Sequence, residues 1–243
     1  MAAKEPVLRV VRAAFEHEPR INLHRFPIHL DFNQDDLVLE GEAENIAAKK
    51  LALELAGAVS GVRGIVDRLR VAPSEPMGDA EIRDHVRDAL LQEPALERCF
   101  IRARVKDNVE TYREPPEAAG EILVEVGDGV VTLNGQVPSL SHKRLAGVLA
   151  WWVPGTRDVV NGLEEAPPEE DNDDEVTDAV CLVLEKDPFV NADEIRVSTQ
   201  NYVVTLEGLV PSEEMREIAE FDAWYVFGVD KVVNRLVVQQ GRW

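Results

Sequence analysis

The sequence predicts an α+β protein built from three tandem modules, each a two-layer unit with the element order α-β-β-α-β. Three observations support this fold class. A pattern of two glycines occurs three times along the chain. Each copy follows an amphipathic segment that stops at an acidic residue and a proline. Each copy also contains two alternating apolar and polar segments joined by turn residues. We therefore expect each module to form a small mixed sheet with two helices on one face.

The repeat aligns on a strand of the form apolar-x-apolar-x-Gly, whose glycines are Gly41, Gly135 and Gly208. A second glycine follows twenty residues later in every copy, at Gly61, Gly155 and Gly228. Valine follows five residues after that glycine, and leucine follows three residues later still. An alanine also lies midway between the two glycines in each copy, at Ala52, Ala146 and Ala219. Matched spacing without gaps identifies an internal repeat, and it makes these six glycines candidate structural residues.

Each module opens with a predicted helix, because apolar residues occur at helical spacing along one face. The three segments are Pro6–His17, Asp79–Gln92 and Asp173–Lys186. Each stops before an acidic residue and a proline, and proline disfavours helical geometry in the residue that precedes it.

A predicted hairpin follows each of these helices. The alternating strands run over residues 28–39, 122–133 and 195–206, with Asn, Asp or Gly at each bend. The sequence Gly127-Asp128-Gly129 therefore predicts a turn between strands rather than a phosphate-binding loop, because no helix follows it.

A second helix and a third strand complete each module. The helices are predicted at residues 44–59, 139–152 and 212–225, with Ser139 and Ser212 as N-caps. We expect the second glycine to end each helix with a positive φ. The third strands are predicted at residues 64–71, 157–163 and 231–238.

The predicted modules span residues 1–72, 78–165 and 172–240, and we refer to them as modules 1, 2 and 3. A short linker joins modules 1 and 2, and the acidic segment 164–175 joins modules 2 and 3. Module 2 also contains an insert at about residues 98–120, before its hairpin. Basic and apolar residues alternate in the insert, which predicts an extra strand with one basic face.

The glycine pattern resembles the BON domain, a family named for bacterial osmotically inducible and nodulation proteins. The dipeptides Gly61-Val62 and Gly228-Val229 carry the resemblance, which extends over nearly the whole chain in three copies. Module 2 departs from the pattern, because Thr156 follows its second glycine. The resemblance implies a non-catalytic binding module. Many similar proteins are periplasmic or lipoproteins with proposed phospholipid binding, and one resembles a cytoplasmic potassium sensor.

The net charge of -20 is concentrated toward the C-terminal end. Residues 169–243 contain 6 Lys and Arg against 18 Asp and Glu, a net charge of -12. A surface this negative repels nucleic acids, so we expect no nucleic-acid partner and instead an unknown protein partner. The acidic surface itself suits a basic protein or weak cation binding, or it serves solubility alone. No apolar run is long enough for a transmembrane segment, and no signal peptide is recognisable. We expect a cytoplasmic location, or a periplasmic one if a leader precedes this sequence.

The sequence offers no catalytic constellation, no metal-ligand spacing among its five histidines and two cysteines, and no cofactor motif. Two features remain as candidate contacts. The insert carries the densest basic patch, which is a candidate contact for an anion or a lipid headgroup or else a solvated strand edge: Arg98, Arg102, Arg104, Lys106 and Arg113. Two aromatic pairs occupy one repeat position and are candidates for packing in the core or between modules, or for an exposed aromatic contact: Trp151 with Trp152, and Trp224 with Tyr225.

These observations favour a non-catalytic binding or scaffold protein, linked by the family resemblance to envelope or osmotic stress. Two alternatives remain open. The basic patch and the aromatic pairs suggest association with a phospholipid surface, although the net charge opposes it. The resemblance to a potassium-binding protein and the acidity of module 3 suggest cytoplasmic sensing of potassium or calcium.

Overall fold

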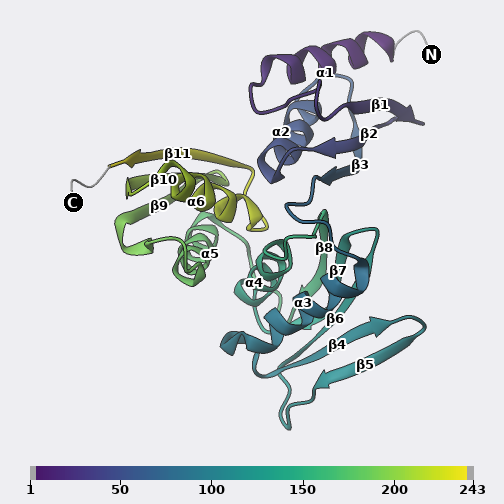
Figure 1. The fold of residues 1–243 in the computed structure, drawn as a ribbon. Helices are drawn as coiled ribbons and strands as arrows, with labels where there is room; N and C mark the ends of the chain where they lie inside the picture. Colours follow the sequence, from purple (N-terminus) through teal and green to yellow (C-terminus); the bar gives the residue numbers. More distant parts are fainter. Residues whose placement is uncertain (1–3, 240–243) are drawn as a thin grey trace. The chain divides into compact units, whose positions relative to one another are not determined.

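A computed structural model describes residues 4–239 of the chain (Figure 1). The fold is α+β and consists of three modules, as the sequence predicts. The chain divides into two compact units, residues 1–72 and residues 73–243. The first unit is module 1, and the second contains modules 2 and 3 together. Residues 1–3 of the predicted module 1 and residue 240 of the predicted module 3 lie outside the described residues.

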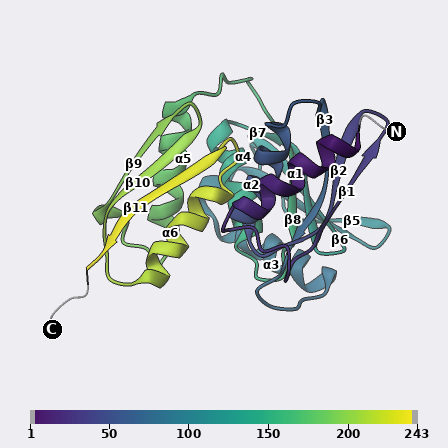
Figure 2. The same cartoon turned by 90° about the horizontal axis from the view of Figure 1, so that it is seen from above.

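Modules 1 and 3 have the same order of elements. Module 1 consists of α1 (Glu5–His17), β1 (Ile28–Asn33), β2 (Asp36–Ala43), α2 (Ile46–Gly57) and β3 (Gly64–Val71). Module 3 consists of α5 (Asp173–Lys186), the short 3-10 helix η2 (Ala192–Glu194), β9 (Ile195–Gln200), β10 (Val203–Val210), α6 (Glu213–Tyr225) and β11 (Lys231–Val238). In each, the first two strands form an antiparallel hairpin, and the third strand lies parallel to the second. Figure 2 shows the strands of module 3 as one layer and α5 and α6 as the other.

Module 2 has a larger sheet, with the strand order β5-β4-β6-β7-β8. Its elements are α3 (Asp79–Gln92), η1 (Pro94–Leu96), β4 (Cys99–Val105), β5 (Asn108–Arg113), β6 (Gly120–Gly127), β7 (Val130–Val137), α4 (Leu140–Trp151) and β8 (Asp158–Glu165). The insert therefore forms two strands, β4 and β5, where the sequence predicts one. β4 lies parallel to β6 and extends the sheet at the edge where the sheets of modules 1 and 3 end.

The core of each module lies between its helices and its sheet. The first helices contribute buried apolar residues at helical spacing, such as Ile82, Val86 and Leu90 in α3. The alanines at the shared repeat position are fully buried in all three modules, so the second helix can pack closely. The predicted N-caps are present, since the Ser139 and Ser212 hydroxyls accept the N–H groups of residues three positions later.

A charged residue at the start of the first helix contacts the hairpin turn in every module. Asp79 in module 2 accepts two backbone N–H groups of the turn, at 2.9 and 3.0 Å. Asp173 does the same in module 3, at 2.7 and 2.8 Å. Module 1 reverses the polarity, because Lys4 occupies this position and pairs with Asp35 of the turn. The sequence analysis did not identify this repeat position.

The first glycine of the repeat allows a close approach between two strands. Gly41, Gly135 and Gly208 have φ values of +141°, +130° and +145°. A Cβ at Gly135 would lie 2.1 Å from the carbonyl oxygen of Glu121, and one at Gly208 would lie 2.0 Å from that of Glu194. The hairpin can therefore close only around a residue without a side chain.

The second glycine departs from the prediction in two respects. The helices α2, α4 and α6 end three or four residues before it, so it does not end them directly. Gly61 and Gly228 have the predicted positive φ, but Gly155 does not. Close packing, rather than backbone conformation, requires glycine at position 155, since a Cβ there would lie 2.5 Å from the Cβ of Met77 and 2.9 Å from Cγ1 of Ile82.

The substitution Gly135→Ala tests the close approach of the strands. Alanine would need a φ of +130°, and its Cβ would collide with the Glu121 carbonyl. We expect the free energy of unfolding to fall by about 2 kcal/mol or more, measured by urea denaturation. The control is Gly127→Ala in the same hairpin, where a Cβ meets nothing within 4 Å. Equal midpoints for the two variants would contradict the steric explanation.

Candidate functional site

The aromatic residues singled out in the sequence lie where module 2 meets module 3. The rings of Trp151 and Tyr225 stack with their centroids 5.5 Å apart and an interplanar angle of 17°. Trp224 is fully buried. The two aromatic pairs lie at the C-terminal ends of α4 and α6, which pack against each other and against α5. The Trp151–Tyr225 stack therefore joins two modules within one compact unit.

A buried carboxyl group lies beside this stack. The indole Nε1 of Trp152 donates a hydrogen bond of 2.8 Å to Oδ1 of Asp222, whose side chain is 2% exposed. The pKa of Asp222 is raised to about 8: burial raises it most, the Trp152 hydrogen bond lowers it, and the nearby carboxyl group of Asp187 raises it. Burial and Asp222 also raise the pKa of Tyr225 to about 12. The contact between the modules thus favours a protonated carboxyl at neutral pH.

A buried arginine forms the second polar part of the same contact. Arg144 of α4 is 1% exposed, and its guanidinium donates to the Asp171 carboxylate at 2.6 Å and to the carbonyl of Phe227 at 2.9 Å. A Cβ at Gly228 would lie 3.1 Å from its Nη2, so that glycine also leaves room for the guanidinium. At the other end of α5, Lys186 pairs with Glu93 of module 2 at 2.9 Å. Sequence reasoning missed Arg144 and Asp222, although each is a charged residue within a helical apolar pattern.

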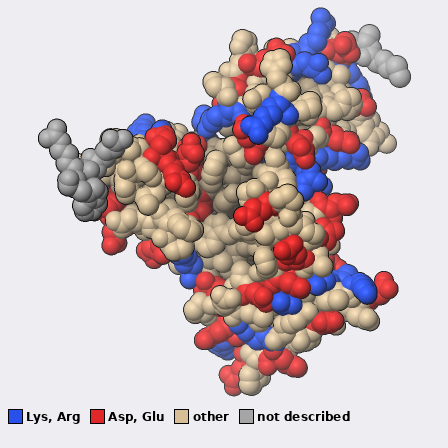
Figure 3. Space-filling view, in the orientation of Figure 1, with Lys and Arg blue, Asp and Glu red and all other residues tan. Residues whose placement is uncertain are grey.

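Four of the five basic residues of the insert interact with acceptors of module 2 itself, two with carboxylates and two with backbone carbonyls. Arg102 pairs with Glu121 at 2.8 Å, and Arg104 pairs with Glu125 of the same strand, β6. Arg113 donates to the carbonyls of Leu91 and Leu96, and Arg98 donates to the carbonyl of Glu117 at 3.4 Å. Lys106 lies in the exposed turn between β4 and β5, with a φ of +57°. In Figure 3, blue and red side chains adjoin over this lower part of the molecule.

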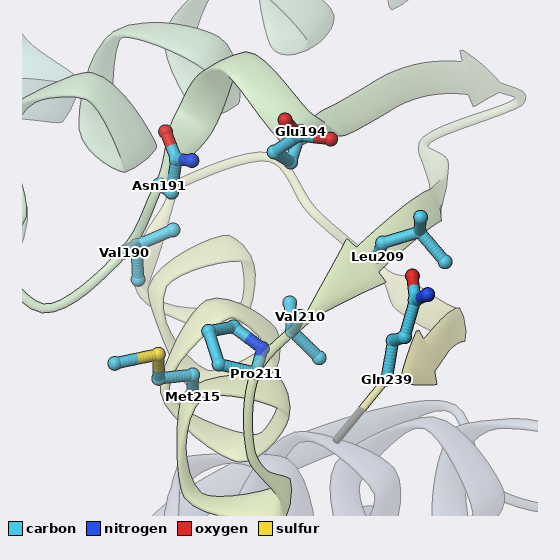
Figure 4. Close-up of a pocket in the computed structure, with 8 residues that line it drawn as sticks. All are labelled: Val190, Asn191, Glu194, Leu209, Val210, Pro211, Met215 and Gln239. Atoms are coloured by element: carbon cyan, nitrogen blue, oxygen red, sulfur yellow. The ribbon is translucent and has the colours of Figure 1, made fainter. Parts of the chain in front are cut away.

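Module 3 contains a pocket of about 570 Å³ at one end of its sheet. The pocket lies among the loop after α5, the last residues of β10, the start of α6 and the end of β11 (Figure 4). Its lining is mainly apolar, with Glu194 and Asn191 at its rim: Val190, Asn191, Glu194, Leu209, Val210, Pro211, Met215 and Gln239. Leu209 is 45% exposed, and the neighbouring Phe189 is 66% exposed. Sequence reasoning missed the pocket, because its residues come from four separate segments.

The potential metal ligands and the two cysteines do not form a metal site or a reactive thiol site in the described residues. Within residues 4–239, no group of three or more His, Cys, Asp and Glu side chains is placed to hold a metal ion. Cys99 and Cys181 are free thiols, and burial raises the pKa of both, which disfavours the reactive thiolate. No helix in the described part of the chain is long and apolar enough to cross a membrane.

Comparison with family models decides the classification. The model of the BON domain matches residues 8–73, 100–167 and 172–240, which together make up most of the chain. The chain belongs to the BON domain family. The three matches correspond to the three predicted copies, and the match in module 2 begins within β4. Membership in the BON family identifies the fold of each module, and it leaves the ligand to be argued from the site.

Comparison with solved structures returns a component of a secretion system. The chain aligns with the C-terminal domain of CdsD, described as the structural protein of the type III secretion system of Chlamydia trachomatis. The identity is 15%, the TM-score is 0.24, and the alignment covers 96% of this chain and 97% of that one. A second structure of CdsD aligns with 15% identity and a TM-score of 0.26, over 98% and 94% of the two chains. Similarity at this level supports no conclusion about function. No curated protein sequence matches the chain significantly.

The substitution Arg144→Ala tests the contact between modules 2 and 3. It removes a fully buried guanidinium and leaves the partly exposed Asp171 carboxylate and the Phe227 carbonyl without their donor. We expect the second unit to lose about 3 kcal/mol of unfolding free energy, measured by urea denaturation. Arg144→Lys should recover only part of the loss, because an ammonium lacks the planar fork of donors.

The matched control for this experiment is Arg235→Ala. Arg235 pairs with Glu207 on the surface of module 3, where its side chain is 64% exposed. Exposed pairs contribute at most about 1 kcal/mol, so we expect a small change. If Arg144→Ala is no more destabilising than this control, Arg144 does not hold the modules together.

The pH dependence of stability tests the buried carboxyl group. The folded pKa of Asp222, about 8, lies above the value of about 3.9 in unfolded chains. Its stabilising contribution is therefore complete below about pH 4 and is lost as the pH rises through about 8. Between pH 5 and pH 9 we expect the melting temperature of the second unit to fall more in the wild type than in Asp222→Asn, which keeps an acceptor for Trp152. Parallel profiles for the two proteins would refute this assignment.

Proposed function

We propose that this BON protein is a non-catalytic scaffold that binds a basic partner protein through module 3. The observation that carries the proposal is the apolar pocket, with exposed Leu209 and Phe189, in the most acidic part of the chain. An exposed apolar patch with a polar rim is typical of protein interaction sites. Residues 169–243 carry 18 acidic and 6 basic residues, so a basic partner would be attracted to this surface.

The organisation of the second unit supports a scaffold role. The Trp151–Tyr225 stack and the buried Arg144 join module 2 to module 3. These side chains therefore stabilise the contact between the modules rather than binding a ligand. Binding to anionic lipid needs a locally positive surface. The basic residues of the insert instead pair with glutamates and backbone carbonyls, which favours a protein partner over a phospholipid.

The test is a titration of a purified partner against surface variants. The partner is captured from the source cells with the wild-type chain, then purified and titrated against wild type, Leu209→Glu and Val160→Glu. Leu209 is 45% exposed and lines the pocket, whereas Val160 is 50% exposed in module 2, so neither change should prevent folding. We expect Leu209→Glu to weaken binding about tenfold or more, because a hot spot would be lost, and Val160→Glu to bind like the wild type.

Vesicles provide the contrasting measurement. We expect no co-sedimentation of the wild-type chain with phosphatidylglycerol vesicles at low salt. Binding to these vesicles that disappears in Arg102→Glu would overturn the proposal in favour of a lipid ligand. A purified partner that binds Leu209→Glu as tightly as the wild type would overturn the role of module 3.

A further inference from the structure

Module 2 shows how a BON sheet accepts an additional strand. β4 lies parallel to β6, with Cys99 opposite Gly120, Ile101 opposite Ile122 and Ala103 opposite Val124. The side chains of Ile101 and Ala103 face the core and are fully buried. Under this added strand, Ile122 and Val124 of β6 are also fully buried. The edge of β6 is thus completed by a segment of the same chain.

The equivalent edge in module 3 is open. Ile122 and Ile195 are equivalent because they lie opposite the repeat glycines Gly135 and Gly208, so β9 corresponds to β6. β9 is the last strand of its sheet, and in the described residues it pairs only with β10. Ile195 and Val197 are partly exposed, whereas their equivalents in β6 are fully buried. Open strand edges are the sites where proteins add a strand from a partner.

The equivalent strand of module 1, β1, is also the last strand of its sheet and pairs only with β2 in the described residues. Its equivalent residues, Ile28 and Leu30, are 9% and 7% exposed, so both are already buried without an added strand. The partial exposure of Ile195 and Val197 on β9 therefore distinguishes module 3 from the two other copies.

The pocket lies where an added strand would enter. In module 2, Cys99 begins β4 and is 1% exposed, and a Cβ at Gly120 would lie 3.2 Å from its Sγ and 3.2 Å from Cα of Val137. Cys99, the first residue of β4, thus fills the space beside Val137 at the end of β7. In module 3 the residue equivalent to Val137 is Val210, which lines the pocket. The pocket has room for the apolar side chain that opens an added strand.

The charges point to a basic strand. Arg102 of β4 pairs with Glu121, the residue before Ile122. Glu194 holds the same place before Ile195, and its exposed carboxylate forms no ion pair within residues 4–239. Ser198 stands where Glu125 pairs with Arg104 in module 2. A strand on β9 would therefore gain one ion pair, through Glu194, if it carried Arg or Lys at the position of Arg102.

We propose that module 3 binds an extended segment of a partner protein as a fourth strand along β9, parallel to it and in the register of β4 on β6. The segment carries apolar side chains at alternate positions, the first of them in the pocket, and a basic residue beside Glu194. This inference rests on the proposed function and specifies its contact surface. It uses backbone hydrogen bonds for affinity and the pocket and Glu194 for selectivity.

The chain itself supplies the probe. A synthetic peptide with the sequence of residues 98–105, with Cys99→Ala and a fluorescent label, is titrated into the full chain and followed by anisotropy. A scrambled peptide of the same composition loses the alternation and is the control for charge alone. We expect saturable binding of the peptide in native order, and at least about fivefold weaker binding of the scrambled one.

Substitutions on module 3 locate the binding site. Glu194→Lys should weaken peptide binding about fivefold, and Ser198→Glu should strengthen it about threefold by providing a partner for the second arginine. Both positions are exposed, so neither variant should unfold the module. Glu217→Lys makes the same charge change as Glu194→Lys at an exposed position on α6, in the helical layer, and should leave affinity within about twofold of the wild type.

The orientation of the added strand is measured by NMR with a nitroxide at the N-terminus of the peptide. A parallel strand in the register of β4 places the label near the start of β9, so signals of Glu194 and Ile195 should broaden. Broadening near Gln200 would overturn the parallel arrangement. Absence of saturable binding, or an equal loss in Glu194→Lys and Glu217→Lys, would overturn strand addition. The proposed function would still stand if the purified partner discriminates between wild type and Leu209→Glu.

Discussion

Each module depends on the close approach between the start of its hairpin and the central strand. A carbonyl oxygen of the incoming segment occupies the place where a side chain of the central strand would begin, so that position must be glycine. This contact fixes the register of the hairpin, and the register in turn places the same apolar residues toward the helices in all three copies. The second helix then returns the chain to a third strand parallel to the second. The rest of each module therefore follows from one steric constraint.

The cohesion of modules 2 and 3 has a different physical basis. Their contact combines stacked aromatic rings with a buried arginine and a protonated carboxyl, rather than relying on apolar burial alone. Such polar groups are costly to bury unless their partners are placed accurately. They therefore favour one arrangement of the two modules over others of similar area. The same residues are then unavailable to an outside ligand, whereas the β9 edge and the pocket of module 3 are open.

Local patterns in the sequence were sufficient for much of the fold. The predicted limits of α3 and α5 coincide with the observed ones, because the helical spacing of apolar residues and the acid-proline pair that follows are both local signals. The second glycine was harder to interpret, since Gly155 is required by the proximity of Met77 and not by its own φ. The pairing of Arg102 and Arg104 with β6, the burial of Arg144 and the pocket all depend on segments distant in sequence. No periodicity within one segment encodes these contacts.

Asp79 and Asp173, the first residues of α3 and α5, bind the hairpin turn of their modules across loops of different length. Asp173 reaches its hairpin turn across 28 residues, whereas Asp79 reaches the same turn across 49, because β4 and β5 lie between. The entropy of closing a loop grows only with the logarithm of its length, so this lengthening costs about 0.5 kcal/mol. The contact anchors both ends of the enlarged loop, and the inserted hairpin buries apolar surface of its own. A BON module can thus acquire extra strands at this point of the chain at little thermodynamic cost.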